Sequence, residues 1–544
     1  MPLPAPASLS RVAVLADDLT SAGDGAAPFR RAGHPARVLL AGTDLGGVAE
    51  EGGVLAVDLG SRLLDEAAAV ARTRGAARAF AGADLVFKTV DSTLRGHVTA
   101  ELRAAREASG RRAVLVAPAF PAEGRTTIAG VQYVHGVRVD ASDFARDPVH
   151  PVRTADLTRL LPEAVLVEPD GPAGTETSPE RDRRVEREVR RSGDDPADRR
   201  AGPGPDELPG GAGHAGREAE RRRDGDGIPD RDGQESRGGG DGRPGGAGHA
   251  GPQGRGHGDG HAGPDGHAGR QDESRADGGG HPGGAGHAGP QGRAHGNGHA
   301  GPDRVLRGEG PVGLDALPGL LAAGGLVVCS AATDAELDRI VAAVPDPRAV
   351  LWVGSPGLAA ALARRHPRTP AVPPGRLPAS ARPLIAVGSA NPATRRQLAR
   401  LVAEPGTAAA VADDPEAAAG KLRVTQAPVR ILHTPDERHA DPDELTARLA
   451  SAAARLAAGD CVDGLVLTGG ATAEAVLRAL GAHGVHLHDE PEPGVARGTL
   501  LASAPEGAPV PVPVPVLVKA GGFGDEDTLL RLCALVRSGG QDSR

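Results

Sequence analysis

Residues 11–25 have the sequence RVAVLADDLTSAGDG, and this stretch predicts the unit from which the fold is built. The apolar run Val12–Ala16 is typical of a buried strand, and the segment after Asp17 and Asp18 is expected to enter a helix almost at once. Polar residues at such a junction lie at the carboxyl end of a strand, where parallel sheets bind their ligands. The residues that follow each apolar run are therefore the candidates for chemistry.

The same alternation continues through the first 150 residues. Continuous apolar strands that alternate with helices predict a mainly parallel sheet with helices on both faces. The further expected strands are Ala36–Leu40, Val54–Val57, Leu85–Phe87 and Ala113–Ala117, and Asp65–Thr73 and Thr99–Ala108 are expected helices.

A second α/β region is expected from about Pro311 to the end of the chain. Its expected strands are Leu326–Cys329, Val350–Val353, Leu384–Val387, Val429–Leu432, Leu465–Leu467 and Val516–Val518. Its expected helices are Asp334–Ala343, Leu358–Arg365, Pro392–Val402, Pro442–Ala457, Thr472–Leu480 and Glu526–Val536.

Between these regions lies a long insert rich in Gly, His and Arg. Residues 201–300 contain 34 of the 80 glycines, and Leu208 and Ile228 are their only Val, Ile, Leu or Phe residues. Such a segment cannot bury enough apolar surface to offset the entropy of ordering it, so we expect disorder over 171–310. The 544 residues thus divide into an N-terminal α/β domain (1–170), the insert (171–310) and a C-terminal α/β domain (311–544). Residues 311–380 either complete the N-terminal domain or form the hinge.

Composition excludes several classes of partner. The net charge of −9 gives no basic field for nucleic acid or anionic lipid. No apolar stretch of about 18 residues is present, and the first residues do not resemble a secretory signal, so we expect a cytoplasmic protein. The three cysteines, Cys329, Cys461 and Cys533, are too far apart in sequence for a disulfide framework or a zinc spacing.

The Asp17–Asp18 pair is the first candidate site. Adjacent residues on an extended strand point to opposite faces, so one carboxylate is expected to face the cleft. A carboxylate there suits proton transfer from a substrate hydroxyl, or Mg²⁺ binding. A structural alternative stays open, because Ser21 and Asp24 fit a helix capping box and Asp18 suits a turn.

The second candidate is LVFKTVDSTLRGH, residues 85–97, which brings two cations and two hydrogen-bonding groups to a strand end. Arginine binds a carboxylate through two parallel hydrogen bonds and lysine supplies a point charge, so the motif suits an anionic, hydroxylated ligand. A weak surface ion pair between Lys88 and Asp91 is the structural alternative. The candidate ligand-binding residues are Lys88, Asp91, Ser92 and Arg95.

A third candidate follows the strand at Ala113–Ala117. Pro118 and Pro121 stiffen the loop before Glu123, Gly124 and Arg125, and Arg125 is expected to be a second anion contact. An ordinary turn is the alternative.

The C-terminal half contains three small-residue turns after strands. They are Gly388–Pro392, Thr468–Thr472 and Lys519–Gly524. Asn391 and Pro392 predict an N-cap and a first helical residue. Glycine lets the backbone approach a phosphate, and helix N-termini present free N–H groups to it, so the three turns together favour a nucleotide site. The chain lacks GxxxxGK[ST], which excludes a P-loop ATPase.

Seven motifs in this order resemble the four-carbon acid sugar kinase family, which includes kinases of 3-oxotetronate, D-threonate and D-erythronate. The resemblance covers about 11–168 and 312–537. It rests on ADDLTSAGD (16–24), FKTVDSTLRG (87–96), PAFPAEGRTT (118–127), VGSANPATRRQ (387–397), LTGGATAEAV (467–476), EPEPGVARG (490–498) and VKAGGFGDEDTL (518–529).

The resemblance implies an N-terminal acid-sugar-binding domain, a C-terminal ATP-binding domain, and transfer of the γ-phosphate of ATP to a terminal hydroxyl with Mg²⁺ bridging the phosphates. It leans toward a homodimer. It implies substrate-side roles for Asp17, Asp18, Lys88, Asp91, Ser92, Arg95 and Arg125, with Asp17 or Asp18 as the base. The expected nucleotide-side residues are Ser389, Gly469, Gly470, Ala471, Thr472, Lys519 and Gly521.

Three features depart from the family pattern. Ser21 stands where relatives usually have Gly, His97 stands where they usually have Asn, and the insert replaces a short crossover. His97 follows Arg95 closely, so it is expected to alter the substrate fit. The competing hypothesis is a non-catalytic sugar-acid sensor, in which the insert blocks closure or recruits a partner.

Overall fold

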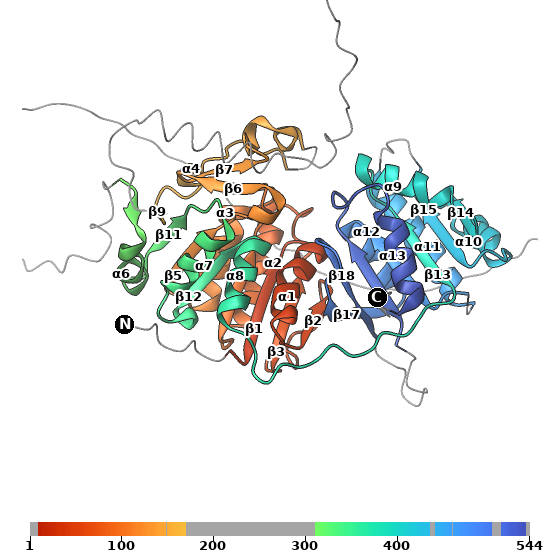
Figure 1. Cartoon of the computed structure of the whole chain (residues 1–544), viewed down its shortest axis with the longest axis horizontal. Coiled ribbons are helices and arrows are strands. Elements are labelled where there is room, and N and C mark those ends of the chain that lie inside the picture. Colours follow the sequence, from red (N-terminus) through yellow and green to blue (C-terminus); the bar gives the residue numbers. More distant parts are fainter. Residues whose placement is uncertain are drawn as a thin grey trace, which may run out of the picture. The chain divides into compact units, whose positions relative to one another are not determined.

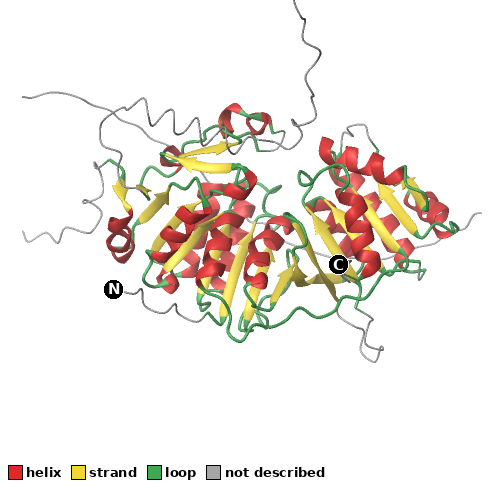
Figure 2. Ribbon diagram, in the orientation of Figure 1, coloured by secondary structure: helices red, strands yellow, loops and turns green. Residues whose placement is uncertain are grey.

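The computed structural model describes residues 9–147, 150–169, 310–435, 441–459, 461–502 and 513–539. The insert predicted over 171–310 lies outside these residues, apart from Gly310. The described chain is an α/β fold, as expected from the sequence, and it is built on a mostly parallel sheet of 16 strands (Figures 1 and 2).

Nine neighbouring strands form the first parallel set. In sheet order they are β10 (Val312–Gly313), β9 (Val165–Glu168), β11 (Leu326–Cys329), β5 (Ala113–Ala117), β12 (Val350–Gly354), β4 (Leu85–Thr89), β1 (Arg11–Ala16), β3 (Gly53–Asp58) and β2 (Ala36–Leu39). Since β10, β11 and β12 pair within this set, their pairing favours the alternative in which the segment after the insert completes the N-terminal domain. The domain boundaries themselves stay a prediction.

Five strands form the second parallel set, and two antiparallel strands link it to the first. The second set is β19 (Pro515–Lys519), β16 (Gly464–Thr468), β13 (Pro383–Val387), β15 (Val429–His433) and β14 (Thr407–Val411). The link consists of β17 (Ala482–Asp489), which pairs with β2, and β18 (Val495–Ala502), which pairs with β19.

Helices cover both faces of the sheet (Figure 2). One face carries α1 (Leu19–Arg31), α6 (Leu317–Ala322), α7 (Asp334–Ala342), α8 (Pro356–Arg365), α10 (Pro415–Arg423), α11 (Pro442–Ala457) and α12 (Gly470–Ala479). The other carries α2 (Glu66–Ala79), α3 (Val98–Ser109) and α4 (Leu157–Leu160) over the first set, and α9 (Pro392–Val402) and α13 (Thr528–Ser538) over the second.

The strands are buried on both faces because their side chains alternate between the two cores. In β1, Val12 and Val14 pack in the core that contains α1, whereas Ala13 and Leu15 pack in the core on the opposite face. This explains the continuous apolar runs of the sequence. A separate small sheet of β6 (Arg125–Ile128), β7 (Val131–Val134) and β8 (Val137–Arg138) follows β5.

The described residues contain no helix with the length and apolarity that crossing a membrane would require.

Candidate active site

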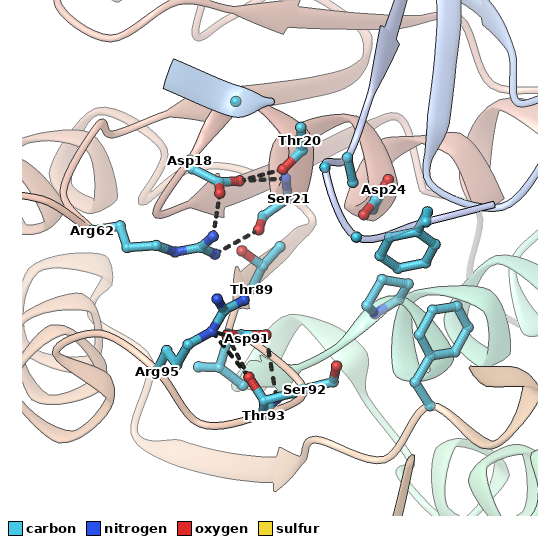
Figure 3. Close-up of a pocket in the computed structure, with 18 of the residues that line it drawn as sticks. Asp18, Thr20, Ser21, Asp24, Arg62, Thr89, Asp91, Ser92, Thr93 and Arg95 are labelled. Carbon is cyan, nitrogen blue, oxygen red and sulfur yellow. Dashed lines mark hydrogen bonds and ion pairs between the residues drawn. The ribbon is translucent and has the colours of Figure 1, made fainter. Parts of the chain in front are cut away.

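Loops at the carboxyl ends of strands from both parallel sets line one pocket of about 430 Å³ (Figure 3). Its lining residues share a position just after a strand or in the first turns of a helix. From the first set they include Asp18, Ser21, Asp24, Arg62, Asp91, Ser92, Arg95 and Arg125, and from the second Ser389, Asn391, Gly469, Gly470, Gly521, Gly522 and Phe523.

Arg62 organises the end of β1. Its Nε and Nη2 donate hydrogen bonds of 2.8 and 2.9 Å to the two carboxylate oxygens of Asp17, and its Nη1 pairs with Asp18. Burial opposes the charged form of Asp17, but the guanidinium of Arg62 and the ammonium of Lys88 together lower the pKa of Asp17. Asp17 itself is 4% exposed, and of the two carboxylates only Asp18 lines the pocket.

Asp91 and Arg95 form a second ion pair, in the loop between β4 and α3. Thr93 donates to Asp91 through its hydroxyl at 2.7 Å, and the guanidinium of Arg95 lies over the ring of Phe144. Burial would raise the pKa of Asp91, but the positive charges of Arg95 and Arg62 hold it well below its usual range. This loop therefore holds the guanidinium of Arg95 next to the carboxylate of Asp91.

Arg125 approaches the second parallel set. Its guanidinium carbon lies 5.7 Å from the centre of the Phe523 ring, which belongs to the glycine loop after β19. Its Nε is buried and has no hydrogen-bond partner in the described structure. An unsatisfied buried donor at a pocket wall is suited to an incoming anion.

The glycine loops of the second set present helix N-termini to the pocket. Asn391 caps α9 by accepting a hydrogen bond of 2.9 Å from the backbone N–H of Ala393, and Pro392 is the first helical residue, as predicted. Gly469, at φ +95°, precedes α12. A Cβ at Gly521 would lie 2.6 Å from the hydroxyl of Ser389, so any other residue at position 521 would displace that hydroxyl.

Two lysines expected to contact ligands do not line the pocket. The Nζ of Lys88 lies 2.9 Å from Glu101 Oε2, and both side chains are almost fully buried. Lys88 therefore does not form the surface ion pair with Asp91 that was the structural alternative, and its contact with a ligand stays a prediction. Lys519 is fully buried and donates to the carbonyl of Ala520 at 2.8 Å, and burial lowers its pKa to about 8. Both lysines belong to strands of the large sheet, Lys88 to β4 and Lys519 to β19, and the loops that follow these strands line the pocket.

Ala471 and Thr472 also lie outside the pocket lining. They occupy the first turn of α12, and Thr472 is buried beneath Gly388. Of the expected nucleotide-side residues, the structure brings Ser389, Gly469, Gly470 and Gly521 together at the pocket.

The capping-box alternative at Ser21 and Asp24 is wrong, because Asp18 is the N-cap of α1 and accepts a hydrogen bond of 2.7 Å from the backbone N–H of Ser21. His97 does not line the pocket. Its Nε2 lies 2.7 Å from the carbonyl oxygen of Leu64, so it contacts the loop that carries Arg62.

Arg62 and Asp24 line the pocket but were not predicted from the sequence as site residues. Arg62 lies four residues after β3, at a strand end that the rule for parallel sheets already marks. Asp24 lies in the second turn of α1, where no strand-end signal applies.

Comparisons with known proteins agree with this division of the pocket. Residues 12–170 match a family model described as a sugar-binding N-terminal domain, and residues 384–529 match one described as a nucleotide-binding C-terminal domain. The chain belongs to the four-carbon acid sugar kinase family. A D-threonate kinase from Bordetella bronchiseptica is 29% identical over 548 residues, which cover 97% of each chain.

Other members of the four-carbon acid sugar kinase family match over shorter lengths. A D-threonate kinase from Cupriavidus necator is 38% identical over 149 residues, 27% of this chain and 35% of the relative. A 3-oxo-tetronate kinase from Methylobacterium radiotolerans is 35% identical over 153 residues, 27% and 36% of the two chains. A solved structure from Salmonella typhimurium, named as a putative tRNA synthase, has a TM-score of 0.58 at 18% identity and covers 96% of this chain and 98% of its own, which shows the fold alone.

The described residues contain no group of three or more His, Cys, Asp and Glu side chains that could hold a metal ion. Mg²⁺ on a nucleotide is usually bound through the phosphates and one or two carboxylates, and we assign no protein ligand to it. The glycine loops fit a nucleotide phosphate, because glycine lets the backbone approach it and the N-termini of α9 and α12 present free N–H groups at the pocket.

Proposed function

We propose that the protein transfers the γ-phosphate of ATP to the terminal hydroxyl of a four-carbon sugar acid of the 3-oxotetronate, threonate or erythronate type. The observation that carries the proposal is the shared pocket: arginine–aspartate pairs of the segment matching a sugar-binding model face glycine loops of the segment matching a nucleotide-binding model.

In this proposal the substrate carboxylate is bound by Arg95 and Arg125, which supply positive charge from two different loops. Asp18 and Asp91 accept hydrogen bonds from the substrate hydroxyls, and the hydroxyl of Ser92 accepts from them or donates to the substrate oxygens. Arg62 holds Asp17 and Asp18 in one orientation, so the site is pre-organised before substrate enters.

The nucleotide is bound by the N-termini of α9 and α12, the hydroxyl of Ser389 and the loop at Gly521. ATP supplies the transferable phosphoryl group, with its own Mg²⁺ neutralising phosphate charge. Lys88 and Lys519 act behind the two loops: Lys88 stabilises α3 against β4 through Glu101, and Lys519 fixes the loop after β19.

Purified protein incubated with ATP, Mg²⁺ and each of the three acids tests this function. We expect ADP to form with at least one acid and not with ATP alone. Folded protein that binds ATP but makes no ADP with any of them would contradict the proposal. The homodimer and the cytoplasmic location remain predictions.

A further inference from the structure

Of the three aspartates that line the pocket, Asp18 and Asp91 are paired with arginine, as is Asp17 beside Asp18. Asp17 and Asp18 both pair with Arg62, and Asp91 pairs with Arg95. The pKa values of Asp17 and Asp91 are lowered, because the guanidinium charges outweigh the effect of burial. A carboxylate held as an ion pair is a weak proton acceptor, because protonation would break the pair.

Asp24 differs from these three. It lines the same pocket, yet no hydrogen bond or ion pair joins its carboxylate to another described residue. In Figure 3 Arg62 and Arg95 lie on one side of the view and Asp24 lies on the other. The pocket lining also includes Gly521, Gly522 and Phe523 of the nucleotide-side loop. A substrate whose carboxylate is bound at Arg95 can therefore extend its far end toward Asp24.

The backbone around Asp24 is held firmly. A Cβ at the preceding Gly23 would lie 2.9 Å from the Cβ of Ala496 on β18, and a Cβ at Gly25 would lie 2.8 Å from Val14 on β1. α1 therefore packs closely on both strands, and glycine on each side of Asp24 permits this approach. The packing of α1 therefore fixes the backbone that carries Asp24 at the pocket.

The charges around Asp24 favour its protonated form. Burial is the largest cause, and the carboxylates of Glu490, Asp18 and Glu123 add to it, while Arg62 alone opposes them. Together they raise the pKa of Asp24 well above its usual range. A general base is most effective when its pKa lies near the working pH.

We propose that Asp24 is the general base that accepts the proton of the reacting hydroxyl. This inference rests on the proposed kinase function. The hydroxyl oxygen forms a bond to the γ-phosphorus as its proton passes to an Asp24 carboxylate oxygen. The bond from the γ-phosphorus to the β,γ-bridging oxygen breaks, and its electron pair leaves with ADP. Asp24 then releases the proton to water. Asp17 and Asp18 are positioning residues through Arg62 in this scheme, and not the base that the sequence predicted.

The test compares Asp24→Asn with the wild type and with Asp338→Asn, which removes an exposed carboxylate paired with Arg364, and neither Asp338 nor Arg364 lines the pocket. We expect Asp24→Asn to lower kcat by about 10²- to 10⁴-fold, with unchanged KM for ATP and unchanged dependence on Mg²⁺, and Asp338→Asn to keep wild-type activity. Wild-type kcat/KM should fall with decreasing pH through a pKa above that of an ordinary aspartate, and this acid limb should be lost in Asp24→Asn.

Three results would overturn the assignment. Asp24→Asn with kcat within about threefold of the wild type excludes a base, as does a wild-type profile with no acid limb above about pH 5. A loss of activity that excess Mg²⁺ restores would make Asp24 a metal ligand instead. If Asp24→Asn does not fold, the wild-type pH profile and Asp24→Glu test the assignment instead. We expect Asp24→Glu to keep the acid limb of the pH profile at a reduced kcat. An inactive wild type would contradict the proposed function, whereas an active Asp24→Asn contradicts only this inference.

Discussion

Arg62 donates to both oxygens of the Asp17 carboxylate, at 2.8 and 2.9 Å, and this pairing fixes the loop after β3 against the end of β1. The same guanidinium reaches Asp18 and the hydroxyl of Ser21. One planar side chain thus sets the orientation of the helix start that faces the substrate side of the pocket.

Arg62→Lys tests this role, because an ammonium cannot reproduce the planar, two-bonded contact. Hydrogen bonds to charged groups contribute about 1.5–3 kcal/mol each, so kcat/KM for the sugar acid should fall roughly 10- to 100-fold while KM for ATP stays the same. Arg364→Lys, in an exposed pair with Asp338, is the matched control. Wild-type kcat/KM in Arg62→Lys would contradict the role.

The buried ion pair between Lys88 and Glu101 is expected to stabilise the fold. Removing one partner of a buried ion pair costs about 3–5 kcal/mol, since the other charge is left uncompensated. Lys88→Met and Glu101→Leu should each lower the free energy of urea unfolding by this order, and the double variant should lose less than the sum. A Lys88→Met variant with full stability and no activity would instead make Lys88 a direct substrate contact.

Gly521→Ala tests the nucleotide loop. The added Cβ would meet the hydroxyl of Ser389 at 2.6 Å, so Ser389 must rotate away. We expect KM for ATP to rise about tenfold, as in Ser389→Ala, because about one hydrogen bond is lost. Gly522→Ala is the matched comparison, since its Cβ would lie 3.5 Å from Asn391 in ordinary contact, and its effect should be smaller. Equal effects of the two substitutions would contradict this account of the loop.

Replacing residues 171–310 tests whether the insert is passive. β9 and β10 pair in parallel, with Val312 opposite Val167, so the chain between them needs a crossover of a dozen or more residues. A variant with a 15-residue Gly/Ser linker in place of 171–310 should retain wild-type kcat and KM. Higher activity in this variant would favour a closure-blocking insert.

The strand ends that carry the pocket could be predicted because apolar runs such as Val12–Ala16 and Leu465–Leu467 are buried on both faces of a parallel sheet. The structure confirms those strands and the N-cap at Asn391. β17 and β18 were missed, since they pair in antiparallel fashion and have a weaker apolar pattern. In β17, His486 and His488 alternate with Val485 and Leu487. This alternation of polar and apolar residues is typical of a half-buried strand, and it was the available signal for β17.

The side-chain partners could not be predicted from spacing. Lys88 and Asp91 are three residues apart, but Lys88 instead pairs with Glu101 on α3, because β4 side chains alternate between opposite faces of the sheet. The carboxylates of Glu490 and Glu123, which are distant in sequence, contribute to the raised pKa of Asp24. Such environments arise from tertiary packing and not from a local motif.

Phosphoryl transfer to a four-carbon sugar acid is tested most directly by ³¹P NMR of the product made from γ-phosphate-labelled ATP and threonate, erythronate or 3-oxotetronate. We expect the label to appear as a phosphate monoester on the terminal hydroxyl of one of these acids, with one ADP formed for each phosphoryl group transferred. Label that remains in ATP with all three acids, or appears only as inorganic phosphate, would contradict it.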